Sequence, residues 1–183
     1  MNTALLLIDI QNDYFDKGAM TLEGTDAACT NAALILALFR EKSLPVVHVQ
    51  HIATSPAATF FLPETEGAEI HKKVKPLKHE KVIVKHYPNS FRETELLDYL
   101  HAIKIKDLVI CGMMTHMCID ATTRASKDFG FSCVVIGDAC ATKNLEVFGQ
   151  SVKAKDVQNG FLALLNYYYS TVQTTEHFLL VSV

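Results

Sequence analysis

The stretch DLVICGMMTHMCIDATTRASKDFGFSCVVIGD, residues Asp107–Asp138, carries the pattern that decides the fold. Its two ends, DLVICG and SCVVIGD, are short runs rich in Val and Ile, as is typical of strands buried on both faces of a parallel sheet. Between them, His116–Phe129 has a helical pattern, and Gly130 is placed to cap the end of that helix. The order strand, helix, strand predicts a βαβ unit.

Three further runs show the same buried-strand pattern: ALLLIDI (Ala4–Ile10), PVVHVQH (Pro45–His51) and KVIVK (Lys81–Lys85). Helical patterns occur over Asp26–Lys42, over Ser90–His101 behind an S-x-x-E capping box, and over much of Leu145–Tyr169, before a final strand near His177–Val183. Strands that alternate with helices predict a mainly parallel sheet with helices on both faces. The predicted fold class is therefore α/β.

Length, charge and cysteine content narrow the class of protein. The chain of 183 residues predicts one domain spanning 1–183, and a net charge of −3 gives no sign of a nucleic-acid-binding surface. No apolar run approaches the roughly 20 residues that a membrane span needs. An Asp interrupts the apolar N-terminal stretch, which argues against a signal peptide. The five cysteines lack CxxC spacing and indicate reduced thiols. We expect a cytoplasmic protein with neither a nucleic-acid nor a membrane partner.

Several motifs are absent from the sequence: GxGxxG, GxxxxGKS/T, HExxH and GxSxG. Interpretations as a dinucleotide, P-loop or zinc-protease protein, or as a serine α/β-hydrolase, lose their main support, and we expect no cofactor. The long segment Ile52–His79 breaks the alternation of strands and helices. A loop of this length in a compact domain is more often functional than a linker.

Polar residues at the carboxyl ends of the predicted strands form the candidate site, because ligands of open parallel sheets bind at that edge. Asp9 lies near the end of the first strand, Lys85 ends the KVIVK strand, and Cys118 falls in the first turn of the helix after DLVICG. A helix N-terminus and a lysine ammonium both lower the pKa of a thiol, and a carboxylate within reach can take its proton. The three residues predict an activated nucleophile with its base.

Three blocks of the sequence resemble the isochorismatase-like cysteine hydrolases. The nucleophile motif is matched by CGMMTHMCIDATTRASKDFG (Cys111–Gly130), the opening strand by ALLLIDIQNDYF (Ala4–Phe15), and the lysine segment by KHYPNSF (Lys85–Phe91). The resemblance implies a Rossmann-like three-layer α/β/α sandwich and a Cys–Asp–Lys triad. Matched block by block, the nucleophile is Cys118, the general acid and base is Asp9, and the third member is Lys85.

The resemblance has three further implications. A cis peptide between Met113 and Met114 would direct the Met114 N–H, together with that of Cys118, at a developing oxyanion. Nicotinamidases of the superfamily bind zinc through an Asp-x-His pair and a further His, but the matching region here, HVQHIATSP (His48–Pro56), has no such Asp. We therefore expect no metal. The resemblance also implies a homo-oligomer, a dimer or larger.

Four residues are candidates for contact with a small-molecule substrate: Phe15, His51, Phe61 and His116. The phenylalanines, with Phe60, would form an apolar wall, although a phenylalanine in a loop often fills the core instead. His51 follows the second strand and faces the candidate site. His116 precedes Cys118 by two residues, and an exposed position at the start of the helix is an equal alternative for it.

The sequence predicts a metal-independent cysteine hydrolase that cleaves a C–N bond of a small amide-like substrate through an acyl thioester on Cys118. Two alternatives stay open. A vinyl-ether hydrolase acting on an isochorismate-like acid would use Asp9 as proton donor and would not need Cys118. A non-catalytic binding protein of the same fold would keep the three residues as an unreactive remnant.

Overall fold

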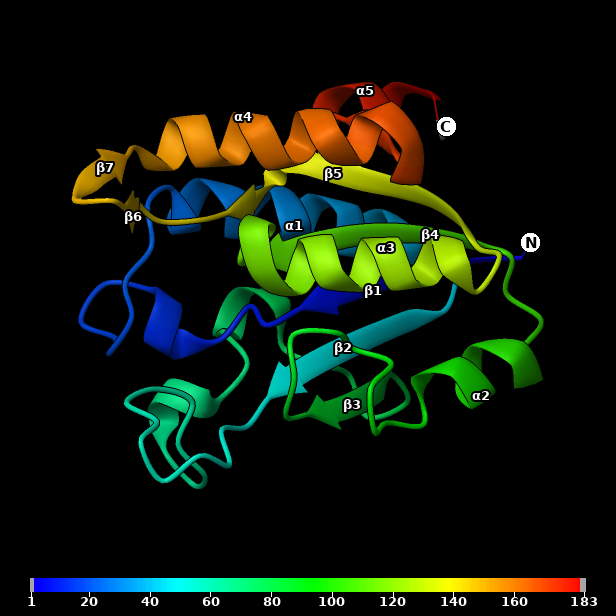
Figure 1. Ribbon diagram of the computed structural model, residues 1–183. Coiled ribbons are helices and arrows are strands. Elements are labelled where there is room, and N and C mark those ends of the chain that lie inside the picture. The colour runs from blue at the N-terminus through cyan, green and yellow to red at the C-terminus, as the bar shows by residue number, and fades with distance from the viewer. Residues whose placement is uncertain (1, 182–183) are drawn as a thin grey trace.

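A six-stranded sheet lies at the centre of the computed structural model, which describes residues 2–181 (Figure 1). Its strand order is β3-β2-β1-β4-β5-β8, and every pairing between neighbours is parallel. The strands are β1 (Thr3–Ile8), β2 (Val46–His51), β3 (Lys81–Lys85), β4 (Asp107–Met113), β5 (Ser132–Ala141) and β8 (Thr171–Gln173). The apolar runs of the sequence form β1 to β5, so the predicted parallel sheet is confirmed.

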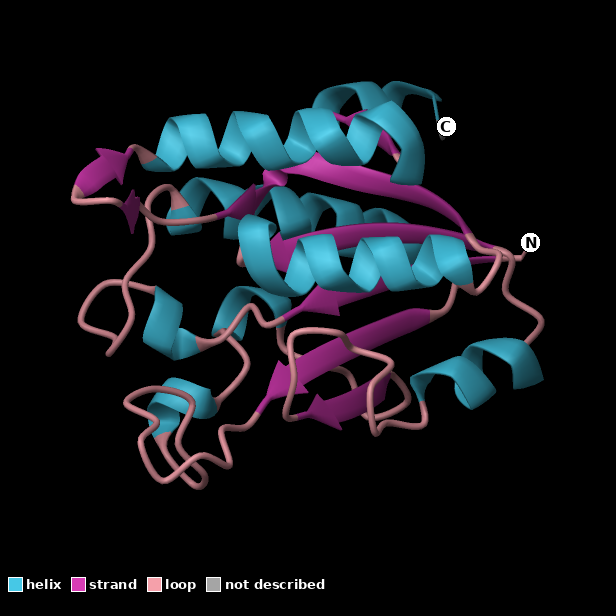
Figure 2. Ribbon diagram, viewed as in Figure 1, coloured by secondary structure: helices cyan, strands magenta, loops and turns pink. Residues whose placement is uncertain are grey.

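Helices cover both faces of this sheet (Figure 2). They are α1 (Thr25–Glu41), α2 (Leu96–Ala102), α3 (Asp120–Asp128), α4 (Ala154–Leu164) and α5 (Thr175–Val181). On one face α1 lies against α5, where the rings of Phe39 and Phe178 stack, and α3 lies across the opposite face (Figure 1). The predicted three-layer α/β/α arrangement is confirmed. Within residues 2–181, no helix combines the length and the apolar character that a membrane crossing requires.

Two helix predictions differ from the structure at their N-terminal ends. Ser90 does not cap a helix; it is buried, its hydroxyl is 2.8 Å from the hydroxyl of Thr122, and α2 begins only at Leu96. The first part of the predicted helix over 145–169 forms an antiparallel hairpin instead, β6 (Leu145–Val147) with β7 (Gln150–Val152). In both segments, contacts and turns that the local pattern does not reveal decide the conformation.

The predicted final strand near 177–183 is wrong for the residues that the structure describes. Residues 177–181 belong to α5, and residues 182–183 lie outside the described part of the chain. The side chain of Asp138 accepts hydrogen bonds from both the amide and the hydroxyl of Thr175, each at 2.8 Å, at the start of this helix. The last strand of the sheet is β8, immediately before it.

The sheet reverses its direction of growth at β1, which pairs with β2 on one side and with β4 on the other. Ligands of open α/β sheets bind outside the carboxyl ends of the strands at such a point. Gly112 of β4 lies opposite Ile8 with a φ of +131°, and a Cβ at Gly112 would collide with the Ile8 carbonyl oxygen. Glycine at this position therefore allows β1 and β4 to meet closely where the candidate residues follow.

Candidate active site

Cys118 lies in a π-helical turn, η4 (Thr115–Ile119), which connects β4 to α3. The carbonyl of Met114 accepts hydrogen bonds from the amides of Met117 and Ile119, at 3.0 and 3.2 Å, and so closes this turn. Cys118 is 4% exposed. Its thiol is thus held at the carboxyl edge of the sheet, where the sequence pattern places it.

Asp9 directly follows β1 and is fully buried. Its φ of +53° lies in the left-handed region, which few residues other than glycine adopt and which often marks a functional site. The Asp9 amide donates to the carbonyl of Val49 at 3.0 Å, so the turn is tied to β2. The backbone therefore fixes a carboxylate inside the protein, where a charge needs a partner.

Lys85, the last residue of β3, supplies that partner. Its ammonium is 2.7 Å from a carboxylate oxygen of Asp9 and 3.2 Å from the sulfur of Cys118, and it donates to the carbonyl of Tyr87 at 3.1 Å. Lys85 and Asp9 are both completely buried. The structure thus brings together the three residues predicted from their positions at strand ends. Asp9 follows β1, Lys85 ends β3, and Cys118 lies in the turn after β4.

The electrostatics of this group differ from the expectation for Cys118. Burial raises the pKa of the Cys118 thiol, and the charge of Asp9 raises it further, whereas the ammonium of Lys85 opposes both without outweighing them. The expected lowering of the thiol pKa is therefore wrong. For Lys85, burial alone would lower the pKa, but Asp9 and Cys118 hold it above its ordinary value. At neutral pH the resting group contains a thiol and an ammonium.

His51 lies next to this group at the end of β2, with its Nδ1 atom 3.1 Å from the ammonium of Lys85. An ammonium only donates, so Nδ1 accepts and the imidazole proton sits on Nε2. Burial, and then the charge of Lys85, lower the pKa of His51 to about 4. The side chain of Gln11 holds the His51 backbone by bonding both its carbonyl and its amide. His51 is therefore a neutral, firmly positioned donor.

An aromatic cluster packs beside His51. The ring centroid of Phe61 lies 5.8 Å from that of His51, 4.7 Å from that of Tyr14 and 4.9 Å from that of Phe60. Phe61 has a φ of +55°, and its amide donates to the carboxylate of Asp13 at 2.6 Å. The sequence alone indicates no more than a loop or capping carboxylate at Asp13, but this buried side chain fixes the position of the cluster.

Tyr14 is a neighbour of the group that the sequence reasoning did not select. It is 2% exposed, and its pKa is raised well above the ordinary value by burial and by the charges of Asp9 and Cys118. The available signal was its place in the block IDIQNDYF, five residues after Asp9. Tyr14 lies in a short 3-10 turn, η1 (Asn12–Tyr14).

The other two predicted pocket residues make their contacts elsewhere. The ring of Phe15 stacks on that of His71, with centroids 4.0 Å apart and planes inclined by 16°. Nδ1 of His116 lies 2.6 Å from the hydroxyl of Thr142, and its ring meets the edge of Phe161 at 6.0 Å. The side chains of Phe15 and His116 therefore contact residues other than Asp9, Lys85 and Cys118.

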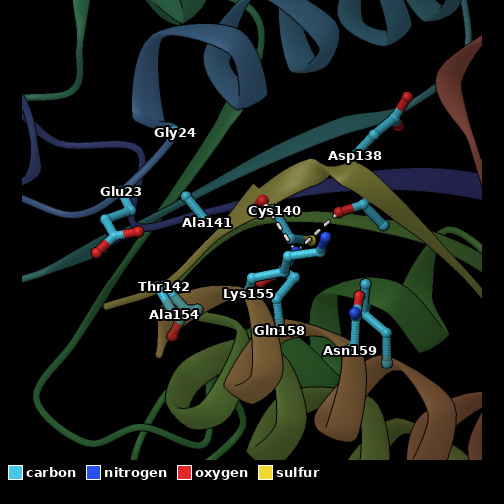
Figure 3. Close-up of a pocket in the computed structure, with 12 residues that line it drawn as sticks. Glu23, Gly24, Asp138, Cys140, Ala141, Thr142, Ala154, Lys155, Gln158 and Asn159 are labelled. Atoms are coloured by element: carbon cyan, nitrogen blue, oxygen red, sulfur yellow. Dashed lines mark hydrogen bonds between the residues drawn. The ribbon is translucent and has the colours of Figure 1, made fainter. Parts of the chain in front are cut away.

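The peptide between Met113 and Met114 is cis, and both residues are buried. The next residue, Thr115, donates from its hydroxyl to the side-chain oxygen of Gln158 on α4 at 2.6 Å. Gln158 lines a cavity of about 470 Å³ and donates from its side-chain nitrogen to the carbonyls of Gly137 and Cys140, at 3.0 and 3.1 Å. Figure 3 shows Gln158 among the residues of the cavity wall. Gln158 therefore braces the segment before Cys118 against the end of β5.

Among residues 2–181, one group of side chains has the composition of a metal site: Asp9, His51 and Cys118, whose ligand atoms lie within 4.8 Å of one another. The ammonium of Lys85 contacts all three residues, at 2.7, 3.1 and 3.2 Å. A metal cation would have to displace this ammonium, whose pKa is raised. The residues present therefore do not fit a resident metal ion.

A sequence profile described as the isochorismatase domain matches residues 3–177. The chain belongs to the isochorismatase family. An uncharacterized isochorismatase family protein of Bacillus subtilis, YddQ, is 53% identical over 98% of this chain and 99% of its own length. A crystal structure from Oleispira antarctica, of a protein assigned to the isochorismatase hydrolases, superposes with a TM-score of 0.93 at 48% identity, covering 97% of this chain and 95% of that one.

Isochorismatase-family relatives that are named for a reaction lie further away. A streptothricin hydrolase of Streptomyces noursei is 32% identical over 78% of this chain and 50% of its own length. A nicotinamidase of Escherichia coli is 26% identical over 78% of this chain and 84% of its own length. The family thus contains hydrolases, amidases among them.

Proposed function

We propose that this isochorismatase-family protein is a metal-independent cysteine hydrolase that cleaves a C–N bond in a small amide-like substrate. The observation that carries the proposal is the contact of one buried ammonium with both a carboxylate and a thiol, at 2.7 and 3.2 Å. A nucleophile, a base and a fixed positive charge are the groups that acyl transfer needs. The amidases among the relatives support the choice of a C–N bond.

In the first half of the reaction, Asp9 acts as base. It takes the proton of the Cys118 thiol, and the sulfur forms a bond to the substrate carbonyl carbon while the carbonyl electron pair moves to oxygen. The amides of Met114 and Cys118 donate to this oxyanion. When the electron pair returns, the C–N bond breaks, and Asp9 delivers its proton to the leaving nitrogen. An acyl thioester and a free amine or ammonia result.

In the second half, water attacks the thioester while Asp9 accepts its proton. Collapse of the second oxyanion breaks the C–S bond, releases the carboxylic acid and restores the Cys118 thiol with the proton from Asp9. Because the pKa of this thiol is raised, its deprotonation accompanies substrate binding and attack; no thiolate is stored in the resting enzyme. In each half-reaction, Asp9 thus accepts one proton and then donates it again.

Lys85 and His51 prepare the charges for these steps. The Lys85 ammonium stabilises the thiolate that forms during attack and, at 2.7 Å, holds the carboxylate of Asp9 in place. His51, neutral because its pKa is about 4, can donate from Nε2 to a polar atom of the substrate. The buried Phe61 beside it offers an apolar surface. A small, uncharged amide with a planar or apolar body suits these neighbours.

The test uses nicotinamide, benzamide and short aliphatic amides, with ammonia release as the signal. Cys118→Ala is expected to abolish turnover, and quenched wild-type enzyme is expected to carry an acyl adduct on the peptide with Cys118. Cys133→Ser is the matched control, because Cys133 is also buried but lies in β5. Retention of amide turnover by Cys118→Ala would refute the thioester mechanism. If the wild type and Cys118→Ala both hydrolyse isochorismate, that result would instead support the vinyl-ether alternative.

A further inference from the structure

The β6–β7 hairpin presents a large apolar side chain to solvent. Phe148, at its tip, is 98% exposed, and Val147 beside it is 50% exposed. Phe148 and Gly149 have φ values of +52° and +71°, which shape the tight connection between the two strands. Figure 1 shows the hairpin projecting at the N-terminal end of α4, beyond the strand ends of the main sheet. A single exposed phenylalanine is unremarkable, but one that adjoins further apolar surface is typical of a contact surface.

An apolar groove of about 390 Å³ lies between this hairpin and α4. Val157, Phe161 and Leu164 form its helical side, at the i, i+4 and i+7 spacing of one helix face. Val147 of the hairpin forms part of the other side. One continuous surface thus combines a protruding aromatic ring with a hollow large enough to accept one.

Gly160 lies inside α4 and lines the same groove. A Cβ at this position would meet nothing within 4 Å, and φ of Gly160 is not in the left-handed region. A glycine in a helix interior is destabilising relative to alanine. The single chain gives no steric reason for it, whereas close approach of another molecule to the helix backbone would.

We propose that the groove receives the Phe148 ring of a second copy of this chain, and that the exchange is reciprocal. A surface that carries both the protrusion and the matching hollow is self-complementary, as a two-fold symmetric dimer requires. Gly160 keeps the helix backbone open for the incoming ring. Phe148 is the central anchor of this interface, in the manner of buried aromatic hot spots.

The charges next to the groove fit such an arrangement. Glu146 and Asp156 line the groove, and Lys153 and Lys155 follow the hairpin in the chain. The segment is therefore electrically balanced, so two copies meet without net repulsion.

The proposed dimer surface also reaches toward the candidate active site. Phe161, in the groove, contacts the ring of His116 at 6.0 Å, and His116 lies in η4 with Cys118. A second copy in the groove therefore packs on Phe161, the neighbour of His116. The assembly itself is independent of which reaction the site performs.

Sedimentation velocity from low to high micromolar concentration tests the proposal on the full chain. The wild type is expected to form dimers, or larger assemblies built from them. Phe148→Lys and Gly160→Phe are each expected to raise the dimer dissociation constant at least about tenfold. Val84→Lys is the control, because Val84 is 48% exposed on β3, at the far edge of the sheet. Circular dichroism checks the fold of each variant.

Gly160→Ala separates assembly from stability. Alanine favours the helix, so the thermal stability of the dilute monomer is expected to be unchanged or higher, while the dimer weakens. A wild type that stays monomeric at the highest concentration overturns the proposal. So does dimerisation of folded Phe148→Lys or Gly160→Phe with wild-type affinity. Neither measurement depends on a substrate, so failure here is distinct from failure of the proposed reaction.

Discussion

Replacing Asp9 by Asn is expected to make the Cys118 thiol more reactive toward alkylation while it abolishes catalysis. The charge of Asp9 is one of the causes that raise the pKa of this thiol, second to burial. Asparagine keeps the shape of the side chain and removes the charge. The ammonium of Lys85 remains beside the sulfur at 3.2 Å and still donates to the carbonyl of Tyr87. A base is lost, but a source of repulsion on the thiolate is lost with it.

The magnitude follows from the distance between the two groups. The carboxylate oxygen of Asp9 and the sulfur of Cys118 lie within 4.8 Å. Two unit charges at that separation repel by about 3.5 kcal/mol at an effective dielectric constant of about 20. This energy corresponds to about 2.5 pKa units, downward in the variant. At any pH below both pKa values, the thiolate fraction is then expected to rise by a factor of about 300.

The assay is the rate of iodoacetamide alkylation at Cys118 as a function of pH, with the site located by mass spectrometry. Access to the buried sulfur limits wild type and variant alike, so the ratio of rates reports the change in thiolate. Lys85→Met is the opposite control: loss of the ammonium is expected to slow alkylation. A folded Asp9→Asn protein that reacts no faster than wild type would refute the electrostatic reasoning.

Three further predictions concern stability. Lys85→Met leaves the carboxylate of Asp9 buried without its counter-charge and is expected to lower the free energy of unfolding, measured with urea, by on the order of 3–5 kcal/mol. Adding Asp9→Asn to this variant should recover part of the lost stability. If the losses of the two single variants simply add in the double variant, the two residues are not coupled. Burial raises the pKa of Glu80, but hydrogen bonds from Arg40, the Leu77 amide and His48 outweigh burial and lower the pKa to about 2. Its stabilisation is therefore full above the ordinary pKa of about 4.3 and is lost as pH falls toward 2. Glu80→Gln should lose about 1–3 kcal/mol at pH 7 and less at pH 3, and an equal loss at both pH values would exclude this origin. Gly112→Ala forces a Cβ against β1 at a φ of +131° and should lower the melting temperature by several degrees; an unchanged melting temperature would show that the sheet adjusts freely.

The strands and the relation of the three key residues could be predicted from the sequence, for a physical reason. Strands buried on both faces need continuous apolar runs, and β1 to β5 have them. Parallel strands place their carboxyl ends along one edge, so Asp9 and Lys85, each at a strand end, had to lie on the same side as Cys118. No knowledge of side-chain contacts was needed for that conclusion.

Properties that depend on contacts across the chain could not be predicted in this way. The charge state of Cys118 depends on how deeply the thiol is buried and on its distance from Asp9, and a local pattern contains neither quantity. The helix boundary near Ser90 depends on a bond to Thr122, which is 32 residues away. The segment that forms β6 and β7 has apolar residues compatible with a helix, and its hairpin turn at Phe148 and Gly149 carries only a weak signal.

The long segment between β2 and β3 is fastened at several points, although it has little regular structure. Asp13 binds its Phe61 amide, Gln11 binds the carbonyl of Ala68 at 2.7 Å, and Arg40 holds Glu80 near its end. A segment tied in this way behaves as a preformed wall, and binding does not have to supply the entropy of ordering it. Such a wall selects by fit: under the amide hydrolysis proposed above, two substrates that differ by one methylene against it should differ about 10- to 200-fold in kcat/KM. The same ties predict that proteases cleave this exposed stretch slowly, despite its length and its prolines.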